Sequence, residues 1–236
     1  MSADTVTALT NAEKAAEEAA NKPVTGAFND STGSYTITEN KTAIYEKPAK
    51  AASKITVPDT VEVPTVGGGT VAVPVTEIKE KAFSSAKKKL TQLTIGNNVE
   101  IIGKSACEKC EKLTTIKGGA AVKETRDKAF ASCTKLKKLP TFNNLVKIGK
   151  SAFAKAKALT KFVFGEFVSN IGSKAFYECE KLKTLTFKGT CKLSVASKAF
   201  DKISSKAKAT IKKAVKKDYT KALKKGKLKE SQIKAK

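Results

Sequence analysis

Apolar positions recur along most of this chain at a nearly constant spacing. The most regular position is the second residue of a repeated small–aromatic pair, which falls at Phe83, Cys107, Phe130, Phe153, Phe176 and Phe200. Successive members lie 23 or 24 residues apart, and Cys107 is the one member that is not aromatic. A fixed period of this size predicts a solenoid, in which each rung packs only against its two neighbours.

Other apolar positions keep step with the aromatic residue. In the rung of Phe176, Ile171 lies five residues before it, Cys179 three residues after it, and Leu182 and Leu185 follow. The Leu-x-x-Leu-x-Phe segment alternates like a short strand, so equivalent segments should stack about 4.8 Å apart into a parallel sheet on one wall. We expect the Ala-Phe-x-x-Cys segment to form a short helical turn on the other wall.

The consensus readable from these rungs is V-x-x-I-G-x-x-A-F-x-x-C-x-x-L-x-x-L-x-F, and it resembles the BspA-like leucine-rich repeat family of cell-surface and secreted proteins. The resemblance covers roughly residues 54–212. It implies an α/β repeat solenoid of about six rungs. Two rungs depart from the consensus, one at Cys107 and one at Leu139-Pro140-Thr141-Phe142, where a proline without an N–H should break the strand.

The segments outside the repeats predict covers for the two ends of the solenoid. We divide the chain into a helical or flexible arm at 1–33, a β-rich cap at 34–75, the solenoid at 76–212, and a C-terminal capping helix with a basic tail at 213–236. Within the cap we expect a hairpin over residues 35–45 and a short antiparallel sheet from 55–57, 61–63 and 71–73. We expect residues 23–33 to be loop and the tail from Lys227 onward to be mobile.

The net charge of +24 comes from 46 Lys and Arg, of which only Arg126 is arginine, against 22 acidic residues. Such an excess raises the question of nucleic-acid binding, but base readout and stacking favour arginine and aromatic residues, and His and Trp are absent. We therefore interpret the lysines as a solvated coat, with no specific nucleic-acid partner and with weak attraction to anionic polymers left open.

No apolar run is long enough to span a bilayer, and no signal-peptide core follows Met1. Two interpretations stay open: a cytoplasmic protein, or an exported protein whose signal is not part of this sequence. The resemblance favours the second, because members of that family are typically extracellular or attached to the cell surface.

Catalytic chemistry finds little support in the sequence. Without His there is no imidazole base, and Gly67-Gly68-Gly69 lacks the Lys and Ser/Thr of a phosphate-binding loop. Cys107 and Cys110 have the spacing of a zinc or redox pair, but no second pair follows, and both fall on core positions of the repeat. We expect no enzyme, no metal, no cofactor and reduced core thiols, with Cys191 outside the repeat positions.

The outward residues of the predicted strands are the candidate binding face. They are Gln92, Thr94, Lys117, Lys138, Lys161, Val163, Thr184, Thr186, Lys188, Lys208 and Thr210. Strand propensity and solubility alone would also place Thr and Lys there. By resemblance, the chain would be a monomeric adhesion or protein-interaction module that binds host or bacterial surface or matrix proteins or glycans. Two alternatives stay open: a spacer domain with no ligand, and polyanion binding through the C-terminal tail.

Overall fold

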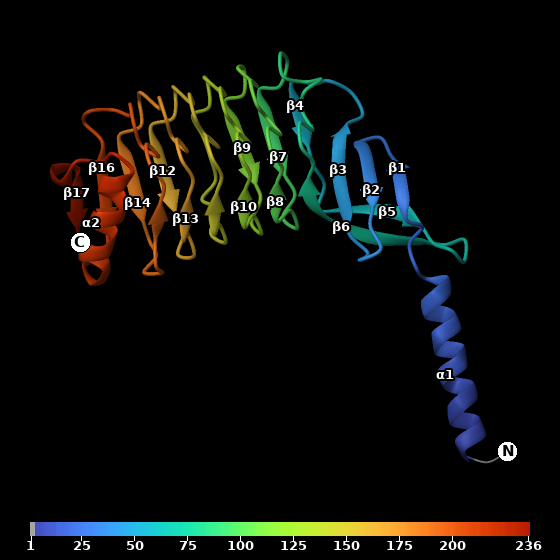
Figure 1. The fold of residues 1–236 in the computed structure, drawn as a ribbon. Helices are drawn as coiled ribbons and strands as arrows, with labels where there is room; N and C mark the ends of the chain where they lie inside the picture. Colours follow the sequence, from blue (N-terminus) through green and yellow to red (C-terminus); the bar gives the residue numbers. More distant parts are fainter. Residues whose placement is uncertain (1–2) are drawn as a thin grey trace.

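The computed structural model describes residues 3–236, which coil into a gently curved stack of rungs (Figure 1). Helix α1 (Ala3–Ala20) projects from the N-terminal end of the stack, and helix α2 (Lys216–Lys225) lies across the C-terminal end. None of the described helices is both long and apolar enough to cross a bilayer.

One side of the stack, here called the long-strand wall, is built from strands of three or four residues. In chain order they are β4 (Lys54–Thr56), β7 (Gln92–Ile95), β9 (Thr115–Gly118), β12 (Lys161–Phe164), β14 (Thr184–Phe187), β16 (Lys208–Ile211) and β17 (Ile233–Ala235). Except for β9 and β12, successive strands pair in parallel with equivalent residues side by side, as Phe162 pairs with Leu185 and Leu185 with Ala209. Alternate side chains are buried, which confirms the strand prediction from the repeat.

The predicted interruption by Pro140 is confirmed. The long-strand wall consists of a three-stranded sheet, β4-β7-β9, and a four-stranded sheet, β12-β14-β16-β17. Between them the chain makes only an isolated bridge from Thr115 to Lys138. Because proline has no N–H to donate, the ladder cannot continue through this rung.

A second wall, here called the short-strand wall, carries a parallel sheet that the repeat pattern did not predict. Its repeat strands have two residues each: β8 (Ile101–Ile102), β10 (Glu124–Thr125), β11 (Lys147–Ile148), β13 (Asn170–Ile171) and β15 (Ser194–Val195). They continue the sheet of β6 (Thr70–Ile78), β3 (Ala43–Pro48), β2 (Gly33–Ile37) and β1 (Gly26–Asn29). Two residues are too few for an alternating pattern, so only one buried position per strand was recognisable as inward, an Ile or Val in four strands and Thr125 in β10.

The Ala-Phe-x-x-Cys segments close each rung as hydrogen-bonded turns and not as the short helical turns that we expected. From the second rung onward, the residues two before and two after the repeat position of Cys107 or the Phe residues adopt left-handed backbone conformations, as at Ser151 (φ 55°) and Lys155 (φ 61°), and these conformations cannot extend a right-handed helix. Their N–H groups point along the stack instead. Ser151, Phe153 and Lys155 donate to carbonyls of the next rung over 2.7–2.9 Å. The turns therefore form a third hydrogen-bonded ladder.

The core is a column of stacked rings. Phe130, Phe153, Phe176 and Phe200 are fully buried, with successive ring centroids 5.3, 5.3 and 5.5 Å apart and rings within 18° of parallel. This confirms that equivalent aromatic residues of successive rungs are in contact.

At the N-terminal end, the predicted hairpin is confirmed as β2 and β3, which pair antiparallel. Strand β5 (Thr60–Pro64) pairs antiparallel with β6. The prediction that residues 55–57 belong to the same antiparallel sheet is wrong, because β4 pairs in parallel with β7 and starts the long-strand wall. Strand β1, within the stretch expected to be loop, pairs with β2, so we propose that the cap begins there.

At the C-terminal end, the predicted lid helix is present as α2, preceded by a 3-10 turn at Lys213–Val215 and followed by Gly226. The tail beyond it is not the mobile segment that we expected. Leu228 is only 3% exposed, a second 3-10 turn forms at Glu230–Gln232, and β17 pairs in parallel with β16. The alternation Ile233-Lys234-Ala235 repeats the strand pattern of the rungs, which explains why the tail adds one more strand.

Candidate functional site

The outward face of the long-strand wall brings together all the candidate residues that the sequence suggested. They lie at the outward positions of β7, β9, β12, β14 and β16, at the isolated bridge of Lys138, and at Lys188 directly after β14. Strand pairing places Lys161, Thr184 and Lys208 side by side in one row and Val163, Thr186 and Thr210 in the next. The lysines of this set are exposed, whereas the second row is partly buried.

Charge on this face is of one sign. Within the described chain, none of the seven long strands contains Asp or Glu, and none of their lysines takes part in an ion pair. Neighbouring lysines therefore have no carboxylate partner to neutralise them. The face carries an uncompensated positive potential that attracts acidic groups.

The short-strand wall differs, because there the charges are paired across rungs. The Lys123 ammonium lies 2.7 Å from the Glu100 carboxylate, and Lys147 lies 2.9 Å from Glu124. The Arg126 guanidinium lies 2.7 Å from the Glu77 carboxylate. The strand lysines of the long-strand wall thus lack the cross-rung carboxylate partners that Lys123, Lys147 and Arg126 have on the short-strand wall.

Four residues of the long-strand face were missed by the sequence analysis: Lys54, Thr56, Thr115 and Lys234. Lys54 pairs with Gln92 and Thr56 with Thr94, so β4 extends both rows by one strand. Lys234 pairs with Thr210 at the other end. The alternation in Lys54-Ile55-Thr56 and Ile233-Lys234-Ala235 is the available signal, but the flanking turn residues and the lysine-rich composition favour an antiparallel cap and a mobile tail for these segments.

The core thiols have structural hydrogen bonds. The Cys133 thiol donates to the Cys107 carbonyl and the Cys179 thiol to the Phe153 carbonyl, each over 3.1 Å and each to the preceding rung. Burial raises the pKa of Cys133 well above its ordinary value and the pKa of Cys179 to about 12, so both stay protonated at neutral pH. Protonated, buried thiols are poor nucleophiles and poor metal ligands. Among the described residues, no group of three or more Cys, Asp or Glu side chains is arranged to hold a metal ion.

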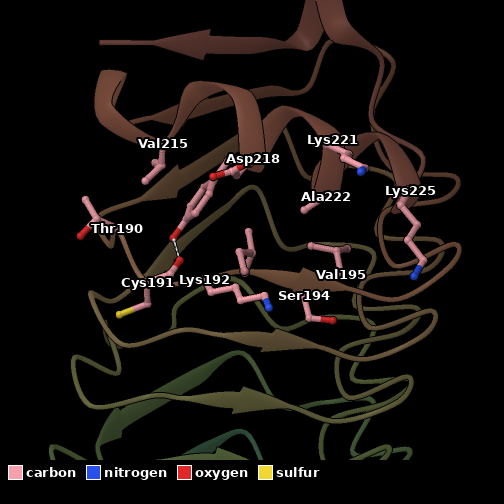
Figure 2. A pocket seen from close by; sticks show the side chains of 12 residues that line it. Thr190, Cys191, Lys192, Ser194, Val195, Val215, Asp218, Lys221, Ala222 and Lys225 are labelled. Carbon is pink, nitrogen blue, oxygen red and sulfur yellow. Dashed lines mark hydrogen bonds between the residues drawn. The ribbon is translucent and has the colours of Figure 1, made fainter.

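A pocket lies where α2 meets the last rung, and we call it the C-terminal pocket. It has a volume of about 700 Å³ and is bordered by residues 190–195 on one side and by Val215 and α2 on the other (Figure 2). The Tyr219 hydroxyl donates to the Cys191 carbonyl over 3.0 Å and ties the helix to the rung beneath it.

Comparison with known proteins agrees with this architecture. The family model for the BspA type leucine rich repeat region, with six copies, matches residues 76–206 and 123–236. No curated protein matches the chain significantly.

Similar solved structures are bacterial leucine-rich repeat proteins. A leucine rich cell surface protein from Faecalibacterium prausnitzii shares 23% identity over 78% of this chain, with a TM-score of 0.67. The leucine-rich repeat protein of T. pallidum shares 23% identity over 77% of this chain and 80% of its own length, with a TM-score of 0.63. One from Bacteroides ovatus shares 25% identity over 78% of this chain and 47% of its own length, with a TM-score of 0.62.

This chain spans 50% of the length of the F. prausnitzii protein. The likeness to these structures supports the solenoid fold, and the family match extends from the first rung to the C-terminal strand. On the strength of the repeated aromatic ladder, the stacked parallel strands and this match, the chain belongs to the BspA-type leucine-rich repeat family.

Proposed function

We propose that this chain is a non-catalytic interaction module that binds acidic proteins or acidic glycans of host or bacterial surfaces through its long-strand wall. The observation that carries the proposal is the outward face of seven strands, which holds lysines and threonines and, in the described chain, no carboxylate. The F. prausnitzii protein of similar fold is described as a cell surface protein, which is consistent with a surface setting for this chain.

The backbone makes this face rigid before any partner arrives. Each of the seven strands is paired within its sheet, the turn ladder joins successive rungs, and the ring column stands behind the rungs of Phe130, Phe153, Phe176 and Phe200. Binding therefore costs little backbone ordering, and only the lysine side chains lose freedom. Threonine hydroxyls between the lysines can both donate and accept hydrogen bonds, which suits carboxylate, sulfate or hydroxyl groups of a partner.

The experiment compares two triple variants with the same net charge. One carries Lys138→Glu, Lys161→Glu and Lys208→Glu on the wall. The other carries Lys47→Glu, Lys104→Glu and Lys150→Glu, which are exposed lysines away from the wall with no ion pair in the described chain. Binding to immobilised poly-L-glutamate and to heparin is measured by biolayer interferometry at several salt concentrations.

We expect the wall variant to lose at least tenfold in affinity for one or both polymers and the control to lose less than twofold. Equal losses would mean that net charge alone attracts the polymers, and the wall would not be a binding face. If neither polymer binds wild type above background, the spacer interpretation is favoured instead.

The structure alters how polyanion binding by the C-terminal tail can be tested. Residues 227–236 are part of the fold, and Lys234 lies in a row of the long-strand wall. Deleting this segment would remove the last strand as well as the tail lysines, so charge reversal is the cleaner test.

A further inference from the structure

We propose that the C-terminal pocket binds a small amphiphile with an apolar body and a single carboxylate head. The pocket is separate from the long-strand face, and the proposal does not depend on the function proposed above. Its volume of about 700 Å³ falls within the usual range for sites that enclose small molecules.

The lining supplies an apolar surface on two sides. The edges of the largely buried Leu193 and Val195 come from the last rung, and the partly exposed Val215 and Ala222 come from the segment around α2. The Tyr219 ring also lines the pocket and is held in place by the hydrogen bond of its hydroxyl to the Cys191 carbonyl. Burial also raises the pKa of Tyr219, so the hydroxyl remains a donor at neutral pH. An apolar ligand body would therefore meet a preformed surface.

The rim supplies positive charge. Lys192, Lys221 and Lys225 border the pocket, are exposed, and have no ion-pair partner in the described part of the chain. In Figure 2, Lys192 extends toward Ser194, and Lys225 lies on that same side of the pocket.

The one acid that borders the pocket is Asp218, and Figure 2 shows it on the opposite side, beside Val215. The pocket is therefore apolar inside and cationic on one side. A carboxylate near Lys192 and Lys225 would gain charge-assisted hydrogen bonds, and the Ser194 hydroxyl could donate a third. A neutral ligand of the same length would lack these contacts.

Decanoate and decanol are suitable probes, because they share an alkyl chain and differ in the charge of the head group. Binding to the full chain is measured by isothermal titration calorimetry. We expect saturable binding of decanoate with one site per chain and at least tenfold weaker binding of decanol.

Two variants test the two parts of the pocket. Ala222→Trp places an indole in the apolar part and should abolish decanoate binding. The pair Lys192→Glu and Lys225→Glu should raise the Kd for decanoate at least tenfold while leaving decanol binding within twofold. The matched control, Lys212→Glu with Lys229→Glu, changes two exposed lysines at the same end outside the pocket and should alter neither Kd by more than twofold.

Thermal unfolding followed by circular dichroism checks that each variant is folded, and the exposed lysine pair keeps the test valid if Ala222→Trp is destabilised. The proposal is overturned if decanoate shows no saturable binding up to 1 mM, if decanol binds as tightly as decanoate, or if the lysine pair has no effect. The triple variant Lys138→Glu, Lys161→Glu and Lys208→Glu should bind decanoate like wild type. Its behaviour separates failure of the pocket proposal from failure of the long-strand wall proposal.

Discussion

Replacing Phe176 by Ala tests whether the ring column holds the rungs together. Phe176 is fully buried and contacts four other rings. Its centroid lies 5.3 Å from Phe153 and 5.5 Å from Phe200, both stacked, and 4.8 Å from Phe162 and 5.7 Å from Phe164, both edge-on. The substitution opens a cavity and removes all four contacts at once.

The magnitude follows from these contacts. Phe→Ala in a well-packed core costs roughly 3 to 5 kcal/mol. Each aromatic pair adds about 0.5 to 1.5 kcal/mol beyond the area that it buries, although these terms do not simply add. We therefore expect the free energy of unfolding to fall by about 5 kcal/mol, at the upper end of the range for such changes. The backbone of the adjacent turns cannot move in to fill the cavity, because hydrogen bonds to the rungs on both sides hold it in place.

Urea unfolding followed by far-ultraviolet circular dichroism measures the loss. The control is Phe167→Ala, because Phe167 is 52% exposed and its removal should cost less than about 0.5 kcal/mol. The reasoning is refuted if Phe176→Ala unfolds within 1 kcal/mol of wild type, or if the two substitutions have equal effects.

Three further predictions concern stability. The Thr125 hydroxyl is buried without a hydrogen-bond partner, on a strand that pairs with the strands of Ile102 and Ile148. Thr125→Val should therefore raise the free energy of unfolding by about 1 kcal/mol in urea titrations. A decrease would contradict this account. Burial raises the pKa of Tyr35 from 10.0 to about 12, so its contribution to stability should be complete below pH 10 and fall by about 2 kcal/mol by pH 12, because the folded state retains a proton that the unfolded state has lost. Burial also raises the pKa of Tyr45, so Tyr35→Phe should reduce that decline without abolishing it in unfolding curves recorded at pH 8 to 12, and an unchanged slope would exclude Tyr35 as a source. Deleting residues 227–236 removes β17 and the buried Leu228 and should cost at least about 3 kcal/mol in the same assay, whereas a mobile tail would cost nothing.

The parts of the fold that the sequence predicts are those where one side chain repeats in one environment. Phe130, Phe153 and Phe176 occupy equivalent positions in successive rungs and stack on one another. Their regular spacing in the sequence is therefore enough to predict the stack. Pro140 breaks a ladder for a reason that holds in any context, because it has no N–H.

Other features depend on backbone conformations that the residue types do not predict. The left-handed turn positions are held mostly by Lys and Ser, such as Lys155 and Ser151, which carry no glycine-like signal. Their conformation is stabilised by the N–H bonds to the next rung, which exist only once the rungs are stacked. The two-residue strands of the short-strand wall went unpredicted for the same reason.

The candidate site could be predicted in part. Alternation along each strand marks the outward residues, and all eleven candidates lie on one wall. The absence of acids from that wall is recognisable only once the strand pairing shows that β4 and β17 belong to it. The structure also shows that Glu100 and Glu124 form ion pairs with lysines on the short-strand wall. Charge segregation is a property of the assembled rungs and not of any local stretch.

Lysine acetylation footprinting tests the role of the long-strand wall most directly. The chain is acetylated briefly with N-hydroxysuccinimidyl acetate, alone or with saturating poly-L-glutamate, and the rate at each lysine is measured by mass spectrometry. We predict that Lys117, Lys161 and Lys208 are acetylated at least fivefold more slowly in the presence of the polymer, while Lys104 and Lys150 change less than twofold. Equal protection of all five, or protection of Lys104 and Lys150 alone, would contradict the assignment of the long-strand wall as the binding face.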